Sequence, residues 1–214
     1  MTINKTRIAI FISGRGSNMD AILDACEAQD YPAEPVLVLA NKPDAKGLDA
    51  ARARGIAAVA VDHKAYDSRE SFEKAIQAEL SKANVEFIAL AGFMRVLTEW
   101  FISRWEGRMI NIHPSLLPSF PGLHTHRRAI DAGCRLTGCS VHYVTAGVDE
   151  GPIIGQAVVP IFKGDDEDTL AARVLKTEHK LYPACLRAVL ENQDRAGCVS
   201  VNEDEANSFI ISTP

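Results

Sequence analysis

The chain has 214 residues, of which 47% are hydrophobic and 24% charged, so it is long enough to bury a substantial core as one globular domain. Its net charge of −5 argues against a general nucleic-acid-binding protein, although it does not exclude a basic pocket for a small anion. No apolar stretch of about 18 residues occurs in the sequence, and its first residues lead us to expect no signal or transit segment. The five cysteines are scattered without a C-x-x-C motif. We therefore expect a cytoplasmic protein with reduced thiols and with no membrane or nucleic-acid partner.

Short apolar runs predict the strands of the first half of the chain. The first run is rich in isoleucine and is followed by a glycine-rich turn and an amphipathic helix. The predicted strands cover residues 8–12, 36–40, 56–61, 85–91 and 109–113. Strands and helices that alternate at this length imply a parallel sheet with right-handed crossovers.

Helices are predicted between these strands. In the first helix, Met19, Ile22, Leu23 and Cys26 have the spacing of one apolar face. The second helix is expected at residues 44–54, with a cap at Asp44 and a stop at Gly55. A third helix should follow a cap at Asp67 or Ser68, with Phe72, Ile76 and Leu80 on one face. A short fourth helix is expected from Thr98 through Trp105.

The second half of the chain predicts two further strands and a long helix. A short helix at residues 127–132 leads to strands at residues 137–144 and 152–161, which could pair antiparallel at one edge of the sheet. Residues 165–191 are predicted to be helical, with Pro183 kinking or dividing the helix. The tail from Gly197 contains the acidic run Glu203-Asp204-Glu205 and is expected to be peripheral.

These elements predict the α/β fold class, with a Rossmann-like, mostly parallel twisted sheet and helices on both faces. No internal repeat or low-complexity linker interrupts the series, so we expect a single domain over residues 1–214.

The glycine-rich turn after the first strand is a candidate phosphate site. Gly14-x-Gly16 suggests a dinucleotide-binding turn, but that pattern needs glycine at Met19, and Asn41 stands where an acidic residue would bind ribose. The backbone N–H groups of Gly16-Ser17-Asn18 at a helix N-terminus would instead suit a monophosphate. The alternative is a plain tight turn in which Ser17 or Asn18 caps the helix.

A second candidate site lies at the end of the fifth predicted strand. Period-2 alternation places Asn111 and His113 on one face, and Pro114 ends the strand because it cannot donate to the sheet. Ligands of open α/β sheets bind at the carboxyl ends of strands. The loop at residues 145–152 contains Asp149 and Glu150, and one of these acids could approach His113 and stabilise its imidazolium form. Such a set suits a reaction with an oxyanion intermediate, whereas the alternative is a solvated acidic turn.

The histidines and cysteines raise two other possibilities. His113, His124, His126 and His142 suggest zinc, but their spacing fits no common structural zinc pattern, and positioned loop and core histidines are the simpler explanation. No cysteine lies in a comparable turn, so a cysteine nucleophile is unsupported. We expect no metal.

Four segments resemble one family of folate-dependent enzymes. They lie at residues 12–18, 91–97, 111–126 and 149–152, in this order. Asn-Ile-His-Pro-Ser-Leu-Leu-Pro is specific for the formyltransferases in general. The Gly-x-Gly-Ser-Asn turn and Pro-Gly-Leu-His-Thr-His narrow the resemblance to the phosphoribosylglycinamide formyltransferases of purine synthesis. The resemblance spans about residues 8–185 and implies a single formyltransferase domain. Its phosphate-binding half would be residues 1–105, and its catalytic and folate-binding half residues 106–214.

The resemblance also implies a reaction and its residues. The formyl group of 10-formyltetrahydrofolate, a co-substrate, would pass to the amino group of glycinamide ribonucleotide. The catalytic residues would be Asn111, His113 and Asp149. The ribonucleotide would contact Gly16, Ser17, Asn18, Leu175, Lys176, Thr177 and Glu178. The folate would contact Arg69, Met94, Arg95, Val96, Leu97, Asn111, Thr145, Ala146, Gly147, Val148 and Asp149. The partners would be small molecules, and the chain a monomer or homodimer.

Three other functions compete with this one. A methionyl-tRNA formyltransferase would normally have a further C-terminal RNA-binding domain and more positive charge. A formyltetrahydrofolate hydrolase would normally have an N-terminal regulatory domain. The length of the chain disfavours both. A non-catalytic binder of phosphometabolites or folate could use the same fold, but intact Asn111, His113 and Asp149 argue against it.

Overall fold

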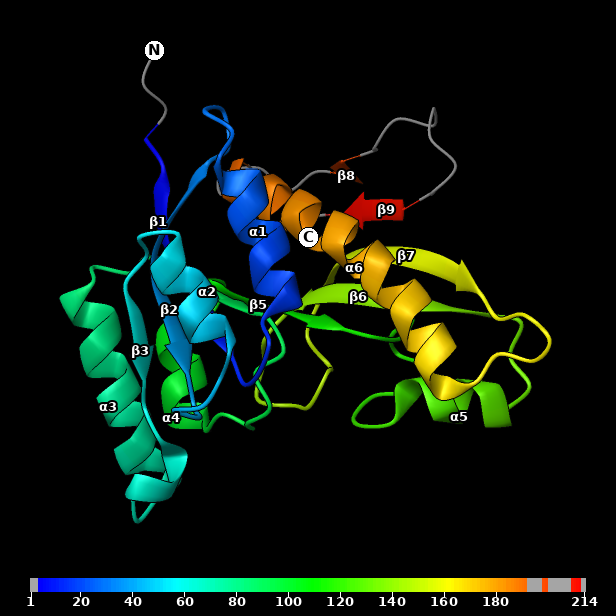
Figure 1. Cartoon of the computed structure of the whole chain (residues 1–214), viewed down its shortest axis with the longest axis horizontal. Coiled ribbons are helices and arrows are strands. Elements are labelled where there is room, and N and C mark those ends of the chain that lie inside the picture. The colour runs from blue at the N-terminus through cyan, green and yellow to red at the C-terminus, as the bar shows by residue number, and fades with distance from the viewer. Residues whose placement is uncertain (1–3, 192–197, 200–208, 213–214) are drawn as a thin grey trace. The chain divides into compact units, whose positions relative to one another are not determined.

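The structure is a computed structural model that describes residues 4–191, 198–199 and 209–212. The chain divides into two compact units, Met1–Ile110 and Asn111–Pro214, which we call unit 1 and unit 2 (Figure 1). Each unit contains its own strands, helices and buried apolar residues.

Unit 1 contains a parallel sheet with the strand order β3-β2-β1-β4. Its strands are β1 Thr6–Ile12, β2 Ala33–Ala40, β3 Ala58–Ala60 and β4 Phe87–Leu90. β1 is paired on both sides, and residues 8–12 are fully buried, as an apolar run between two helical layers should be. The strand order reverses between β1 and β4. The carboxyl ends of these two strands therefore form the switch point at which such sheets bind ligands.

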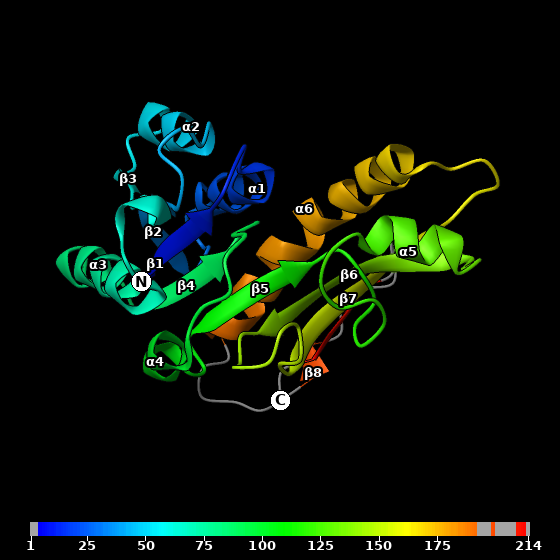
Figure 2. The ribbon, with the colours of Figure 1, turned by 90° about the horizontal axis from the view of Figure 1, so that it is seen from below.

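Helices cover both faces of this sheet. They are α1 Ser17–Cys26, α2 Gly47–Ala53, α3 Arg69–Lys82 and α4 Glu99–Ile102, with short 3-10 turns η1 His63–Ala65 and η2 Ser103–Trp105. Figure 2 shows α1 and α2 on one side of the strands of unit 1 and α3 and α4 on the other. α3 is capped by Ser68, whose hydroxyl accepts a hydrogen bond from the Ser71 N–H at 3.1 Å. The predicted Rossmann-like α/β class is therefore confirmed.

α2 begins later than predicted. The cap expected at Asp44 is wrong, because the helix starts after Lys46, and no side chain of the described residues caps it. Its first residue, Gly47, donates its N–H to the carbonyl of Gly14 at 3.0 Å, so the start of α2 is set by the loop after β1. Gly55 follows the helix end with a φ of 75°, as a helix stop should.

Unit 2 contributes antiparallel strands and a long helix. Its elements are β5 Met109–His113, which begins at the end of unit 1, α5 Thr125–Asp131, β6 Leu136–Tyr143, β7 Ile153–Pro160, α6 Glu167–Glu191, β8 Cys198–Val199 and β9 Phe209–Ser212. β5 has the predicted bounds because Pro114 ends it. β6 and β7 pair antiparallel as predicted, and the strand order of this part is β5-β6-β7-β9-β8.

Pro183 was expected to kink or divide α6. The helix is continuous through Pro183, so the division is wrong, whereas the kink stays a prediction. The helix packs against β6 and β7, and Leu170, Val174, Leu181 and Leu186 are fully buried. Burial of each such side chain stabilises by about 1.5–3 kcal/mol, and an interior proline costs about 3 kcal/mol. The buried face therefore outweighs the proline, and the helix continues.

The C-terminal tail is not wholly peripheral, contrary to the prediction. Phe209–Ser212 forms β9, which pairs antiparallel with β7 and with β8. The acidic run Glu203-Asp204-Glu205 lies outside the described residues. In the part of the chain that the structure describes, no helix is both long and apolar enough to cross a membrane.

Candidate active site

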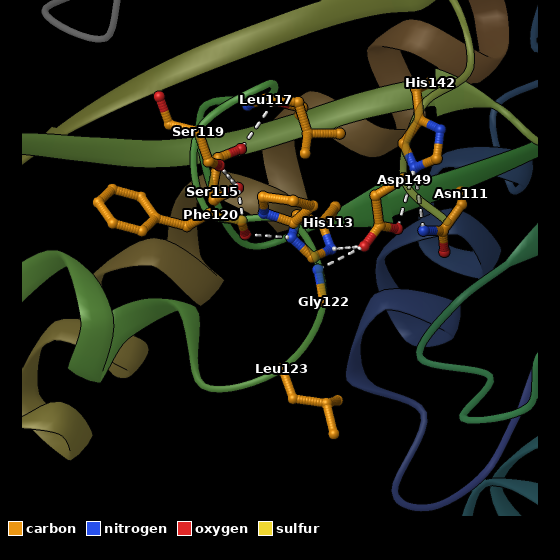
Figure 3. Close-up of polar contacts among 12 residues, drawn as sticks. Asn111, His113, Ser115, Leu117, Ser119, Phe120, Gly122, Leu123, His142 and Asp149 are labelled. Carbon is orange, nitrogen blue, oxygen red and sulfur yellow. Dashed lines mark hydrogen bonds and ion pairs between the residues drawn. The ribbon is translucent and has the colours of Figure 1, made fainter. Parts of the chain in front are cut away.

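His113 ends β5, and its imidazole lies between two hydrogen-bond acceptors (Figure 3). Nε2 lies 3.1 Å from the carbonyl oxygen of Phe120, and Nδ1 lies 3.3 Å from Oδ2 of Asp149. The residue is only 6% exposed. The loop that Pro114 begins therefore returns to the ring and encloses it.

The two neighbours of the His113 ring differ in how well they suit its neutral and its charged form. A carbonyl oxygen and a carboxylate only accept hydrogen bonds, and a neutral imidazole has one N–H. A neutral ring would point a lone pair at either the Phe120 carbonyl or the Asp149 carboxylate. The imidazolium donates to both and pairs its charge with the carboxylate. The geometry thus favours a positively charged His113.

Asp149 is held by a strained backbone. It lies in the loop between β6 and β7 with a φ of 57°, and Phe120, the other partner of the ring, has a φ of 55°. Non-glycine residues rarely occupy this left-handed region, and such strain clusters at functional sites. The carboxylate also accepts a hydrogen bond from the Gly122 N–H at 2.9 Å. Both partners of His113 are thus fixed in unfavourable conformations by their surroundings.

Asn111 lies on the same face of β5 as His113 and contacts a second histidine. Its Nδ2 is 3.2 Å from Nε2 of His142, a β6 residue that is only 3% exposed. Nδ1 of His142 lies 2.9 Å from the Tyr143 carbonyl, and its Nε2 lies 3.7 Å from Oδ1 of Asp149. The structure therefore brings together the three residues predicted to be catalytic and adds His142, which the sequence analysis treated as a core histidine.

Side chains of β6 and β7 hold the loop after β5. The Ser115 hydroxyl donates to the Ser119 carbonyl at 2.6 Å, and the Ser140 hydroxyl donates to the Ser115 carbonyl at 2.7 Å. Nε2 of Gln156 donates to the Leu117 carbonyl at 2.9 Å. These bonds fix the loop immediately before the carbonyl that faces the imidazole. None of them was predicted from the sequence.

The turn after β1 in unit 1 leads directly into α1. Gly16 is the N-cap, with a φ of 79°, and no side chain in the described ranges caps this helix. The alternative in which Ser17 or Asn18 is the cap is therefore wrong, because these are the first two helical residues. The first N–H groups of a helix lack intrahelical partners and, with the helix dipole, favour an anion.

Gly47, the first residue of α2, packs closely against this turn. A Cβ atom at this position would lie 2.5 Å from Cδ1 of Ile12 and 3.0 Å from the carbonyl oxygen of Arg15. Only glycine therefore lets α2 approach the turn this closely. The sequence analysis missed this residue because nothing near it marks a contact with a distant loop.

Hydrogen bonds hold the segment of residues 94–97, which follows β4, at both ends. The Met94 N–H donates to the Ser13 hydroxyl at 2.7 Å, and that hydroxyl donates to Oδ1 of Asn41 at 2.5 Å. At the other end, the Thr98 N–H donates to Oε1 of Glu73 at 2.7 Å. The Ser13 hydroxyl thus connects the ends of β1 and β2 to the segment after β4.

The other residues predicted to bind ligands differ in exposure. Apolar side chains are open to a ligand in each unit, since Met94 is 66%, Val96 55% and Val148 53% exposed. Arg69, Ala146 and Lys176 are also exposed, Arg95, Thr145, Gly147, Leu175 and Thr177 are half-buried, and Leu97 and Glu178 are buried.

The cysteines and histidines give no support to the alternative chemistries. Burial raises the pKa of Cys26 to about 12 and also raises the pKa of Cys139 and of Cys185, so these thiols stay protonated. No group of three or more histidine, cysteine, aspartate or glutamate residues among those described is arranged to hold a metal ion.

Several known proteins and solved structures that are similar to this chain are named phosphoribosylglycinamide formyltransferase. The model of the formyl transferase family matches residues 6–186. Phosphoribosylglycinamide formyltransferase of Escherichia coli (strain K12) is 48% identical over 176 residues, which cover 82% of this chain and 83% of that protein. The crystal structure of phosphoribosylglycinamide formyltransferase from Brucella melitensis has 53% sequence identity and a TM-score of 0.84, and the match covers 87% of this chain and 96% of that one.

The chain also matches part of much longer proteins. Trifunctional purine biosynthetic protein adenosine-3 of Drosophila pseudoobscura pseudoobscura is 50% identical over 184 residues, which are 85% of this chain. The chain spans 14% of the length of that protein and 19% of the length of the Gallus gallus protein of the same name.

Proposed function

The chain belongs to the formyl transferase family, and we propose that it transfers the formyl group of 10-formyltetrahydrofolate to the amino group of 5′-phosphoribosylglycinamide. The products are 5′-phosphoribosyl-N-formylglycinamide and tetrahydrofolate, in the synthesis of purines (IMP). The observation that supports this best is the position of the His113 imidazole, held between Asp149 and the Phe120 carbonyl on the same strand face as the Asn111 amide.

The chemistry requires stabilisation of negative charge on the formyl oxygen. The folate supplies the electrophilic formyl carbon. Nδ2 of Asn111 has two N–H groups, and only one is directed at His142, which leaves the other for the formyl oxygen. We assign His113, as an imidazolium, as the second group that stabilises this charge. Loss of one such donor commonly costs about 3–4 kcal/mol of transition-state stabilisation.

Asp149 has two tasks in this mechanism. It holds His113 in its charged form across 3.3 Å. It also relays a proton, through water, because the attacking amine loses a proton and the leaving folate nitrogen gains one. The amine first adds to the formyl carbon, which gives a tetrahedral intermediate with negative charge on the formyl oxygen. The intermediate then collapses, and the bond from that carbon to the folate nitrogen breaks. These steps need no metal and no covalent enzyme intermediate.

Substrate binding is assigned to both units. The helix N-terminus at Gly16, with its left-handed backbone, supports a phosphate site in unit 1. We assign the ribonucleotide to Gly16, Ser17, Asn18, Leu175, Lys176, Thr177 and Glu178. The exposed apolar side chains of Met94, Val96 and Val148 support a heterocycle site. We assign the folate to Arg69, Met94, Arg95, Val96, Leu97, Asn111, Thr145, Ala146, Gly147, Val148 and Asp149.

One assay distinguishes this function from its rivals. The protein is mixed with a 10-formyl folate analogue, with and without glycinamide ribonucleotide, and the absorbance change is followed. Turnover that requires the ribonucleotide supports the transferase. Turnover without it would identify a hydrolase, and binding without turnover would identify a regulator.

The proposal also covers the domain organisation, location and oligomeric state of the enzyme. We propose that both units act as one functional domain, because the family model spans residues 6–186 and thus includes most of each. We place the enzyme in the cytoplasm as a monomer or homodimer, with small molecules as its partners. The free thiols of Cys26, Cys134, Cys139 and Cys185 fit a reducing compartment, and the net charge of −5 fits the lack of a nucleic-acid partner. Light scattering measures the oligomeric state.

A further inference from the structure

We propose that His142 is a positioning residue for formyl transfer: as a neutral imidazole it holds the Asn111 amide with Nδ2 toward itself and so fixes which amide atoms face the substrate. The inference rests on the proposed function of Asn111 as an oxyanion donor. It is carried by the hydrogen bonds of three residues of unit 2, Asn111, His142 and Tyr143. Figure 3 shows the contact between Asn111 and His142.

The tautomer of His142 follows from its partners. Nδ1 lies 2.9 Å from the Tyr143 carbonyl oxygen, which only accepts hydrogen bonds, so Nδ1 bears the proton. In the neutral ring Nε2 then has a lone pair, and the group 3.2 Å away must be a donor. That group is Nδ2 of Asn111. A single backbone carbonyl thus determines, through the imidazole, the direction of the catalytic amide.

The direction of an amide decides its chemistry. Nδ2 presents two donors and Oδ1 presents only lone pairs, so a rotation of 180° would replace a donor to the formyl oxygen by a repelling acceptor. Figure 3 shows Nδ2 of Asn111 toward His142 and Oδ1 away from it. The lone pair of His142 opposes the rotated amide, because two acceptors would then face each other.

The neutral state of His142 is maintained by its surroundings. Burial lowers the pKa of His142, and the positive charge of His113 acts in the same direction, whereas Asp149 and the Tyr143 carbonyl oppose them. If Nε2 were protonated, it would point a second N–H at the Asn111 donor and would attract Oδ1 of Asp149, which lies 3.7 Å away. Protonation would therefore release the amide and disturb the acid that partners His113.

Two substitutions separate positioning from packing. His142→Phe keeps a ring in the buried site but removes the acceptor, and we expect kcat to fall about a hundredfold with little change in the KM for the ribonucleotide. His142→Gln can place its side-chain carbonyl near the original Nε2 and should restore most of kcat. Cys139→Ala is the matched control, because this fully buried residue lies on the same strand but points to the opposite face. It should lower Tm and leave kcat unchanged.

The imidazole nitrogens provide a readout that does not depend on activity. In ¹⁵N NMR of the full chain near neutral pH, His142 should show a protonated Nδ1 and an unprotonated Nε2. A proton on Nε2, or a wild-type kcat in His142→Phe, would overturn the inference, as would equal losses of kcat in the Phe and Gln variants. Failure of the proposed function would look different, since the wild-type chain itself would then lack ribonucleotide-dependent turnover.

Discussion

Phe120 and Asp149, the two partners of His113, both have left-handed backbone conformations, which cost on the order of 1–3 kcal/mol each. This strain makes one substitution more informative than others. Asparagine tolerates the left-handed region better than most residues, so Asp149→Asn removes the charge with little change in backbone strain. Alanine at position 149 would change both the charge and the backbone strain.

We therefore predict that Asp149→Asn lowers kcat at least about a hundredfold, because the imidazolium of His113 loses its counter-charge and the proton relay loses its carboxylate. His113→Ala should have a similar effect. The KM for the ribonucleotide should remain nearly unchanged in both variants. Glu150→Gln is the matched control, since this exposed neighbouring carboxylate should contribute nothing to turnover. Steady-state kinetics measure all three, and near-normal turnover in either catalytic variant would contradict the assignment.

Single residues differ in how far the sequence reveals them. Asn111 and His113 could be placed on one face because strand alternation is a local property and Pro114 marks the strand end. Alternation also puts His142 on one face of β6, but its contact with Asn111 depends on how β6 lies beside β5. That register is a tertiary property, so the fourth member of the cluster was visible only in the structure.

At the scale of the elements, the Ser13 hydroxyl joins three segments of unit 1. It is the acceptor for the Met94 N–H, in the segment after β4, and the donor to Asn41, which follows β2. Nδ1 of His63 donates to the Asn41 carbonyl at 2.8 Å and so holds that residue as well. The start of the segment of residues 94–97, to which we assign folate, is therefore anchored through the Ser13 hydroxyl oxygen.

We predict that Ser13→Ala raises the KM for the folate several-fold and lowers the stability by about 1–3 kcal/mol, since Met94 N–H and Asn41 Oδ1 lose a buried partner. The ribonucleotide KM should change less. Ser71→Ala, which removes half of the α3 capping box, is the control for stability loss alone and should leave both KM values unchanged. Equal effects of the two variants on the folate KM would refute the anchoring role.

A substitution at Gly47 tests the turn before α1, to which we assign the phosphate. Gly47→Ala places a methyl group 3.0 Å from the Arg15 carbonyl, and the turn before α1 must move to accommodate it. We expect the ribonucleotide KM to rise about tenfold or more, while kcat at saturation changes little. Ala51→Gly in the same helix should cost about 1 kcal/mol of stability without this effect on KM. An unchanged KM in Gly47→Ala would show that the turn does not bind the phosphate.

The elements themselves were predictable where a local signal marks them. Apolar runs indicated β1 and β5, and the cap expected at Asp67 or Ser68 indicated the start of α3. The start of α2 was not predictable, because Gly47 is held by a loop far away in the sequence, whereas Asp44 offered only a local cap. Local signals thus predict where an element begins, except where a contact with a distant part of the chain sets its start.

At the scale of the whole molecule, a half-buried ion pair connects the long helix α6 to the loop between it and β7. Arg173 of α6 donates to both carboxylate oxygens of Asp165, at 2.7 and 2.8 Å, and also to the Pro160 carbonyl at 2.8 Å. Its guanidinium lies 4.5 Å from the ring centroid of Phe162. The Arg173 hydrogen bonds lower the pKa of Asp165 from 3.8 to about 2.

This shift predicts a dependence of stability on acid. Because the pKa of Asp165 is lower in the folded chain than the ordinary 3.8, its contribution is complete above about pH 4 and is lost as the pH falls toward 2. Asp165→Asn should therefore be less stable than the wild type at neutral pH, and the difference should shrink between about pH 4 and pH 2. Urea unfolding of both proteins at several pH values measures this difference in the free energy of unfolding. Asp131→Asn, which removes an exposed pair with Arg127, should differ little from the wild type throughout.

The arrangement of the whole chain was predictable in outline. Alternating strands and helices indicated the α/β class, and two adjacent apolar runs indicated the antiparallel pair β6 and β7. The pairing of β9 with β7 was not predictable, because residues 209–212 give a short apolar signal after a polar stretch, and strand pairing over such a distance leaves no local mark.

The assignment of binding and catalysis to different residues can be tested on the stability of the folded chain. Glycinamide ribonucleotide at about 100 times its Kd should stabilise the protein by about 2.7 kcal/mol. For a chain of 214 residues this corresponds to a rise in Tm of about 5–10 °C. His113→Ala and Asp149→Asn should keep this rise, because they remove the chemistry and leave the phosphate site intact. Gly47→Ala should lose most of it. Loss of the rise in the His113 or Asp149 variant would mean that these residues bind the ribonucleotide, and their low turnover would then no longer indicate a role in formyl transfer itself.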